Sequence, residues 1–102
     1  RHLELLRGAS DARGRPLQIV TLETPGRVRP EFAGKDFAAG YVNFLLTSKA
    51  LFLPEFGDAA ADRAAREALA AHLPTHRIVQ LNIDAIAAGG GGIHCTTQQE
   101  PA

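Results

Sequence analysis

Four consecutive glycines at residues 89–92 constrain the end of this chain more than any other feature of the sequence. Gly loses more backbone freedom on folding than any other residue, so a run of four is a poor continuation of a helix or a strand. The run predicts a loop whose backbone can lie close to a bound group, because no Cβ stands in the way. The stretch GGGGIHCTTQQ (89–99) places the only cysteine of the chain, Cys95, directly behind this loop.

Length and charge restrict the class of protein. A chain of 102 residues builds one modest core, and 11 Lys and Arg balance 11 Asp and Glu. This balance argues against a nucleic-acid partner, since phosphate binding needs a clustered basic excess. No apolar run approaches the roughly 20 residues of a membrane span, so we expect no membrane partner. One cysteine permits no internal disulfide, which fits a reducing compartment and makes the cytoplasm the expected location.

Apolar periodicity and turn residues predict the order of the elements. A helix end is expected at 3–9, with Gly8 near its C-terminal cap. The chain starts at Arg1 rather than Met, so we expect a processed or trimmed product. The elements expected next are a turn at 10–16, a strand at 17–22, a loop at 26–35, a hairpin of 41–46 and 50–53 closed by Pro54, a helix from its N-cap Asp58 to His72, a strand at 77–83, a connector at 84–88, and an extended stretch at 94–99. This order indicates an α/β chain built from a β-β-α-β unit.

Cys95 is the first candidate for chemistry because a thiolate is the best side-chain nucleophile. Backbone N–H groups of a glycine loop can approach and bind a substrate, because no Cβ stands in the way. The alternative is that Cys95 is a small buried apolar residue and the glycines form a flexible connector. Sequence spacing alone leaves both interpretations open.

The histidines and carboxylates are weaker candidates. In an extended segment His94 and Cys95 point to opposite faces, so His94 is not expected to be the base. The other histidines, His2, His72 and His76, are expected at the surface or at helix ends. Zinc binding by His72, His76, His94 and Cys95 is a minor alternative, since the spacing matches no standard ligand pair. We expect Asp58 and Asp62 to serve as helix cap and first-turn charge.

The stretch GGGGIHCTTQQEP strongly resembles the C-terminal signature of agmatine deiminases and bacterial-type peptidyl-arginine deiminases. Two further stretches agree in the right order: ARGRPLQIVTLETP (12–25), and YVNFLL (41–46) followed by LPEFGD (53–58). The resemblance implies a pentein fold, a fan of five β-β-α-β units. Residues 1–102 then form the C-terminal segment of such a domain, with the last unit and part of the preceding one.

The resemblance also implies the chemistry. The Cys95 thiolate attacks the guanidinium carbon of a small substrate, agmatine, while the backbone of Gly89, Gly90, Gly91 and Gly92 lies against it. Ammonia leaves, and water hydrolyses the thiouronium adduct to a ureido product of polyamine biosynthesis. Neither metal nor organic cofactor is implied, His94 is given no catalytic role, and the oligomeric state, a homo-oligomer included, is left open.

One part of the family pattern is missing from the chain. The acid/base His of these enzymes belongs to a His-x-Asp motif, and no His-x-Asp occurs in these 102 residues. A positioned acid/base contributes typically about 10²–10⁴ in rate, so we expect the chain alone to be inactive. Two alternatives remain: a peptidyl- or free-arginine deiminase, and a non-catalytic fragment that acts only as a packing or interaction module.

Overall fold

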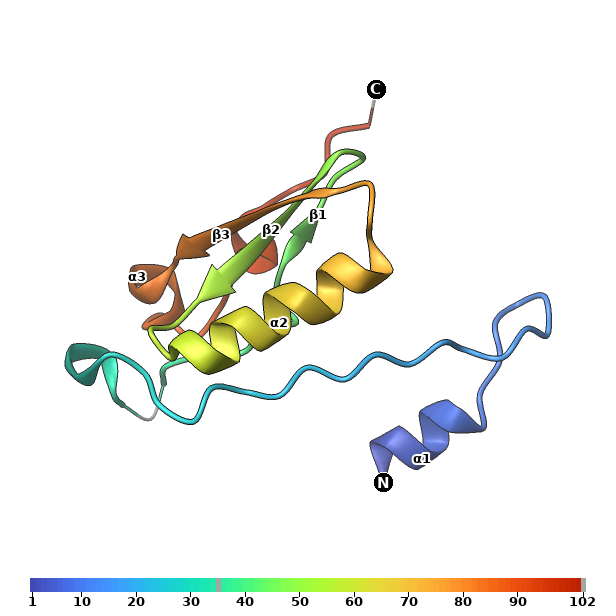
Figure 1. Cartoon of the computed structure of the whole chain (residues 1–102), viewed down its shortest axis with the longest axis horizontal. Helices are drawn as coiled ribbons and strands as arrows, with labels where there is room; N and C mark the ends of the chain where they lie inside the picture. The colour runs from blue at the N-terminus through green and yellow to red at the C-terminus, as the bar shows by residue number, and fades with distance from the viewer. Residues whose placement is uncertain (35, 102) are drawn as a thin grey trace.

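A three-stranded sheet and one long helix form the body of the protein (Figure 1). The computed structural model describes residues 1–34 and 36–101, so Lys35, the end of the predicted 26–35 loop, and Ala102 lie outside the described residues. The elements are α1 (His2–Arg7), η1 (Pro30–Phe32), β1 (Leu45–Leu46), β2 (Ala50–Glu55), α2 (Ala59–His72), β3 (Arg77–Asn82), α3 (Asp84–Ala87) and η2 (His94–Thr96). β1 is antiparallel to β2, and β3 is parallel to β2. The predicted α/β class and its β-β-α-β order are confirmed.

α2 begins and ends where the sequence predicted. The Asp58 side chain accepts a hydrogen bond from the Ala61 N–H at 3.2 Å, and it also accepts one from Gly26 at 3.0 Å. These backbone donors, Ala61 first, hold the pKa of the Asp58 carboxyl below its ordinary value. Asp58 therefore caps the helix and ties the preceding loop to it.

The helix buries a face of small residues against the sheet. Ala65 and Leu69 are buried, and they join one apolar cluster with Leu51 and Leu53 of β2. The other buried members of this core are Tyr41, Phe56, Ile83, Ala87 and Ile93. Alanines let the helix axis lie close to the strands, because little side-chain volume separates them.

The strand predicted at 17–22 is wrong. This segment runs extended past α2 in Figure 1 and pairs with no strand among the described residues. Leu17 is 41% and Val20 39% exposed. A β-branched sequence has strand propensity, but a strand needs a neighbouring backbone to receive its hydrogen bonds, and the sheet offers none beside this segment. The preceding turn at 10–16 is confirmed, since Ser10 and Pro16 form an antiparallel bridge.

Pro54 does not end its strand, contrary to the sequence prediction. β2 continues to Glu55, and Pro54 pairs in register with Leu81 of β3. β1 contacts β2 only at Leu51 and Phe52, so β2 has a single neighbour at Pro54. A residue without an N–H is tolerated where one edge of the strand is free.

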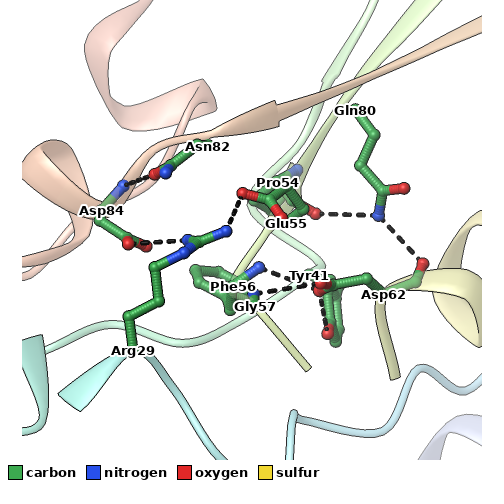
Figure 2. A network of polar contacts seen from close by, with 10 residues as sticks. All are labelled: Arg29, Tyr41, Pro54, Glu55, Phe56, Gly57, Asp62, Gln80, Asn82 and Asp84. Atoms are coloured by element: carbon green, nitrogen blue, oxygen red, sulfur yellow. Dashed lines mark hydrogen bonds and ion pairs between the residues drawn. The ribbon is translucent and has the colours of Figure 1, made fainter. Parts of the chain in front are cut away.

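A buried carboxylate connects α2 to the segment before β1 and to the chain that follows β2 (Figure 2). Asp62 Oδ1 accepts from the Tyr41 hydroxyl at 2.7 Å and from the Phe56 N–H at 2.9 Å, and Oδ2 accepts from the Gly57 N–H at 3.1 Å. The Asp62 carbonyl accepts from Gln80 Nε2 of β3 at 2.9 Å. Burial, and then the hydrogen bond to Asp62, raise the pKa of Tyr41. Asp62 is thus more than the first-turn charge that the sequence predicted.

A second polar cluster closes the carboxyl ends of β2 and β3. Arg29 donates from Nη1 to Asp84 Oδ2 at 2.7 Å and from Nη2 to Glu55 Oε1. The hydrogen bond to Asp84, and then the one to Glu55, raise the pKa of Arg29. Gly57 has φ 92°, and a Cβ there would come within 3.0 Å of the Arg29 side chain. The loop before β1 is therefore held to the sheet by an ion-paired arginine that the sequence did not single out.

None of the helices in residues 1–34 and 36–101 has both the length and the apolar character needed to cross a bilayer.

Replacing Asp62 with Asn is expected to destabilise the fold. Three donors converge on two carboxylate oxygens, and an amide offers only one acceptor while turning an N–H₂ toward a donor. We expect D62N to lower the free energy of unfolding by about 2–3 kcal/mol, and Tyr41→Phe by less, because Asp62 then keeps both backbone donors. Urea unfolding followed by circular dichroism measures both. Glu67→Gln, which removes an exposed charge from the same helix, is the control, and equal midpoints for D62N and E67Q would contradict the role of Asp62.

Candidate active site

Two segments distant in sequence enclose a hollow of about 580 Å³ beside β1. Its lining residues are Val42, Asn43, Phe44, Leu45, Leu46, His94, Cys95 and Gln99. They belong to 41–46 and 94–99, two of the stretches that carry the family resemblance in the sequence. The fold therefore brings those stretches together at one place.

The segment that carries the thiol is a 3₁₀ turn, and the extended stretch predicted at 94–99 is wrong at its start. The Thr96 hydroxyl donates to the Ile93 carbonyl at 2.8 Å, and the Thr97 hydroxyl donates to the His94 carbonyl at 2.8 Å. These bonds to carbonyls three residues earlier compete with an extended backbone. His94 and Cys95 consequently line the same hollow instead of pointing to opposite faces.

Cys95 is exposed and hydrogen-bonded, so the buried-apolar alternative for it is wrong. Asn43 Nδ2 lies 2.8 Å from Cys95 Sγ, and Asn43 Oδ1 accepts from the Cys95 N–H at 3.2 Å. The Asn43 amide, and then the Gly92 N–H, hold the pKa of the Cys95 thiol below its ordinary value. A thiol in this setting is more readily converted to the reactive thiolate.

Asn43 holds its place because the chain is fixed on both sides of it. Tyr41 is bound through its hydroxyl to Asp62, and Leu45 pairs with Phe52 of β2. The Asn43 carbonyl also accepts from the Ile93 N–H at 3.1 Å. Sequence reasoning did not select Asn43; the available signal was an asparagine, a poor strand former, inside the apolar run YVNFLL.

The glycine loop packs against Asn43 and the thiol. Gly90 has φ 91°, which other residues rarely adopt. A Cβ on Gly91 would lie 3.3 Å from Cys95 Cβ, and one on Gly92 would lie 2.6 Å from Asn43 Cβ and Cγ. The positive φ at Gly90 and the contact of Gly92 with Asn43 give these two positions a structural reason to be glycine. Residues 89–92 are not among those that line the hollow, and the substrate contact of Gly89, Gly90, Gly91 and Gly92 stays a prediction.

The hollow has few other titratable groups. Among the described residues that line it, His94 is the only titratable side chain besides Cys95, and none is a carboxylate. His94 Nε2 lies 3.5 Å from Gln99 Nε2. His72, the last residue of α2, is not among the residues that line the hollow, and its Nδ1 lies 3.3 Å from Gln18 Nε2. Residues 1–34 and 36–101 contain no cluster of three or more side chains able to hold a metal ion, so the structure gives the zinc alternative no support.

Comparisons with known proteins identify the family to which this β-β-α-β unit belongs. The model of the Porphyromonas-type peptidyl-arginine deiminase family matches residues 1–101. The chain belongs to this family. It is 35% identical over 116 residues to the agmatine deiminase of Pseudomonas putida, covering 98% of this chain and 31% of that protein. It is also 33% identical over 115 residues to the agmatine deiminase of Medicago truncatula, covering 96% of this chain and 31% of that protein.

A solved structure, the agmatine deiminase of Enterococcus faecalis catalysing its reaction, superposes with a TM-score of 0.84 at 33% identity. The match covers 98% of this chain and 31% of that one. The fold is accordingly a partial pentein, as the resemblance implied. The chain spans about a third of the length of the relatives that it matches.

Placing a Cβ on Gly92 is expected to disturb the thiol directly. In Gly92→Ala the new atom overlaps Asn43, so the asparagine or the loop must move and the bond to Cys95 is lost. We expect a loss of about 1–3 kcal/mol in unfolding free energy, as for overpacked interiors, and slower alkylation of Cys95 by iodoacetamide at neutral pH. Gly40→Ala is the control, because a Cβ at Gly40 meets nothing within 4 Å. Wild-type alkylation kinetics in G92A would refute this packing argument.

Proposed function

We propose that this chain is the cysteine-bearing segment of a guanidine hydrolase that acts on agmatine. The observation that carries the proposal is an exposed thiol of lowered pKa, hydrogen-bonded by Asn43 in an open hollow. The relatives named agmatine deiminase support the choice of substrate. In this role Cys95 is the nucleophile.

The reaction would proceed through a covalent adduct. The Cys95 sulfur forms a bond to the guanidinium carbon, and the C–N bond to one terminal nitrogen breaks as that nitrogen takes a proton and leaves as ammonia. Water then adds to the carbon, the C–S bond breaks, and the thiolate is regenerated. The balance is agmatine plus water to N-carbamoylputrescine plus ammonia, a step toward putrescine in the cytoplasm.

The hollow contains only part of what this reaction needs. A guanidinium stays protonated at neutral pH, so carboxylates must hold it and an acid must protonate the departing nitrogen. No carboxylate lines the hollow in the described part of the chain. We propose that the rest of a longer protein supplies the carboxylates and the acid/base histidine, and that residues 1–102 alone are inactive.

A second substrate class is favoured by the family match itself. The matching family model is that of peptidyl-arginine deiminases, so a peptidyl or free arginine is the alternative guanidinium substrate. The same nucleophile serves each of these substrates, because the reacting group is the same.

Cys95→Ser in the complete protein is expected to reduce ureido-product formation by at least about 10⁴-fold, because a serine hydroxyl is not ionised at neutral pH. Colorimetric detection of the ureido group, with agmatine, arginine and a peptidyl-arginine compared in parallel, measures the loss and ranks the substrates. Ser48→Ala, on the exposed turn of the hairpin, is the control variant. Full activity in C95S, or no product from any of the three substrates with the wild type, would end the proposal.

A further inference from the structure

We propose that Asn43 is a positioning residue that orients the Cys95 thiolate for attack. The inference rests on the proposed function, since it assigns Cys95 the part of nucleophile. It concerns how this chain prepares the sulfur before any substrate arrives. Its evidence is the geometry of one side chain that contacts both the backbone and the sulfur of the same residue.

The orientation of the Asn43 amide follows from its backbone partner. The Cys95 N–H can only donate, so the atom of the amide that faces it at 3.2 Å must be the oxygen. The amide nitrogen is thereby turned to the sulfur at 2.8 Å. A carboxamide carries this donor and this acceptor on the same carbon, whereas ionised Asp has no donor and Ala has neither group.

Asn43 is itself immobilised, so it can fix the sulfur. The backbone carbonyl of Asn43 accepts a hydrogen bond from the Ile93 N–H at 3.1 Å. Gly92 packs so closely that a Cβ there would overlap the Asn43 side chain. The glycine run and the asparagine therefore form one unit around Cys95. This unit explains why residue 92 is a glycine. The explanation does not depend on the substrate contact that was expected from the sequence.

An N–H donor at the sulfur favours the thiolate over the thiol, because it interacts more strongly with the charged form. The Gly92 N–H acts on the pKa of the thiol in the same direction. Among the residues that line the hollow, His94 is the only other group that titrates, and it makes no hydrogen bond to Cys95 in the described structure. The acidity of the thiol therefore depends on Asn43 more than on any other side chain described.

The test is the pH profile of Cys95 alkylation in the complete protein, read by mass spectrometry of the peptide that contains Cys95. Asn43→Asp keeps the shape and the acceptor for the Cys95 N–H, but it replaces the donor with a negative charge. The pKa of the thiol should rise, so the alkylation rate at pH 7 should fall roughly tenfold or more. Asn43→Ala removes the donor without adding charge and should give a smaller fall in the same direction.

Asn82→Asp is the matched control, since Asn82 is the only other asparagine in the chain and its Oδ1 likewise accepts a backbone N–H, from Asp84 at 2.9 Å. N82D should alkylate like the wild type. If N43D and N43A, folded by circular dichroism, both keep the wild-type pH profile, the proposal is overturned. If either variant fails to fold, the other one alone decides.

Deiminase assays on the same variants separate the two proposals. A raised thiol pKa, together with a kcat that falls more than KM changes, supports Asn43 as a positioning residue in catalysis. A raised thiol pKa in a complete protein whose wild type forms no ureido product supports the control of the thiol by Asn43 and overturns only the proposed function. Alkylation needs no substrate, so the two failures remain distinguishable.

Discussion

The buried carboxylate of Asp62 is the interaction on which the rest of the structure depends. The carboxylate accepts hydrogen bonds from the segment before β1 and from the chain that leaves β2. The backbone carbonyl of Asp62 accepts one from a side chain of β3. One residue at the start of α2 thus fixes three parts of the chain that local sequence does not connect. Because Tyr41 is one of these parts, the position of Asn43 two residues later, and with it the environment of the thiol, depends on a helix that does not line the hollow.

Local rules predicted the body of the fold well. The cap at Asp58, the helix to His72 and the hairpin follow from propensity, capping and period, which act within a few residues. The errors concern elements whose state depends on a distant partner. Residues 17–22 have strand composition but no neighbouring strand, and Pro54 stays inside β2 because one edge of that strand is free. A sequence pattern does not show which strands will lie beside a given segment in the folded sheet.

In the candidate site, too, the local motif was predicted and the distant contact was not. Cys95 was predicted from its motif, whereas Asn43 could not be paired with it by spacing, since 52 residues separate the two. The turn at η2 was missed because it depends on two threonine hydroxyls that bond to nearby carbonyls. The sequence of residues 94–99 is equally compatible with an extended chain. The sequence predicted that the glycine run lies close to a bound substrate, and this stays a prediction. What approaches Gly92 in the described structure is a side chain of the same protein.

The long separation between Asn43 and Cys95 has a consequence for the life of the chain. Closing a loop of that length is entropically unfavourable, and one pair of hydrogen bonds does not offset the loss until β2, α2 and β3 have already shortened the path. In a newly made or unfolded chain Cys95 is therefore an ordinary thiol, with neither Asn43 nor the glycine N–H beside it. The lowered pKa of the thiol is therefore acquired by folding, and before folding Cys95 reacts with electrophiles only as an ordinary cysteine does.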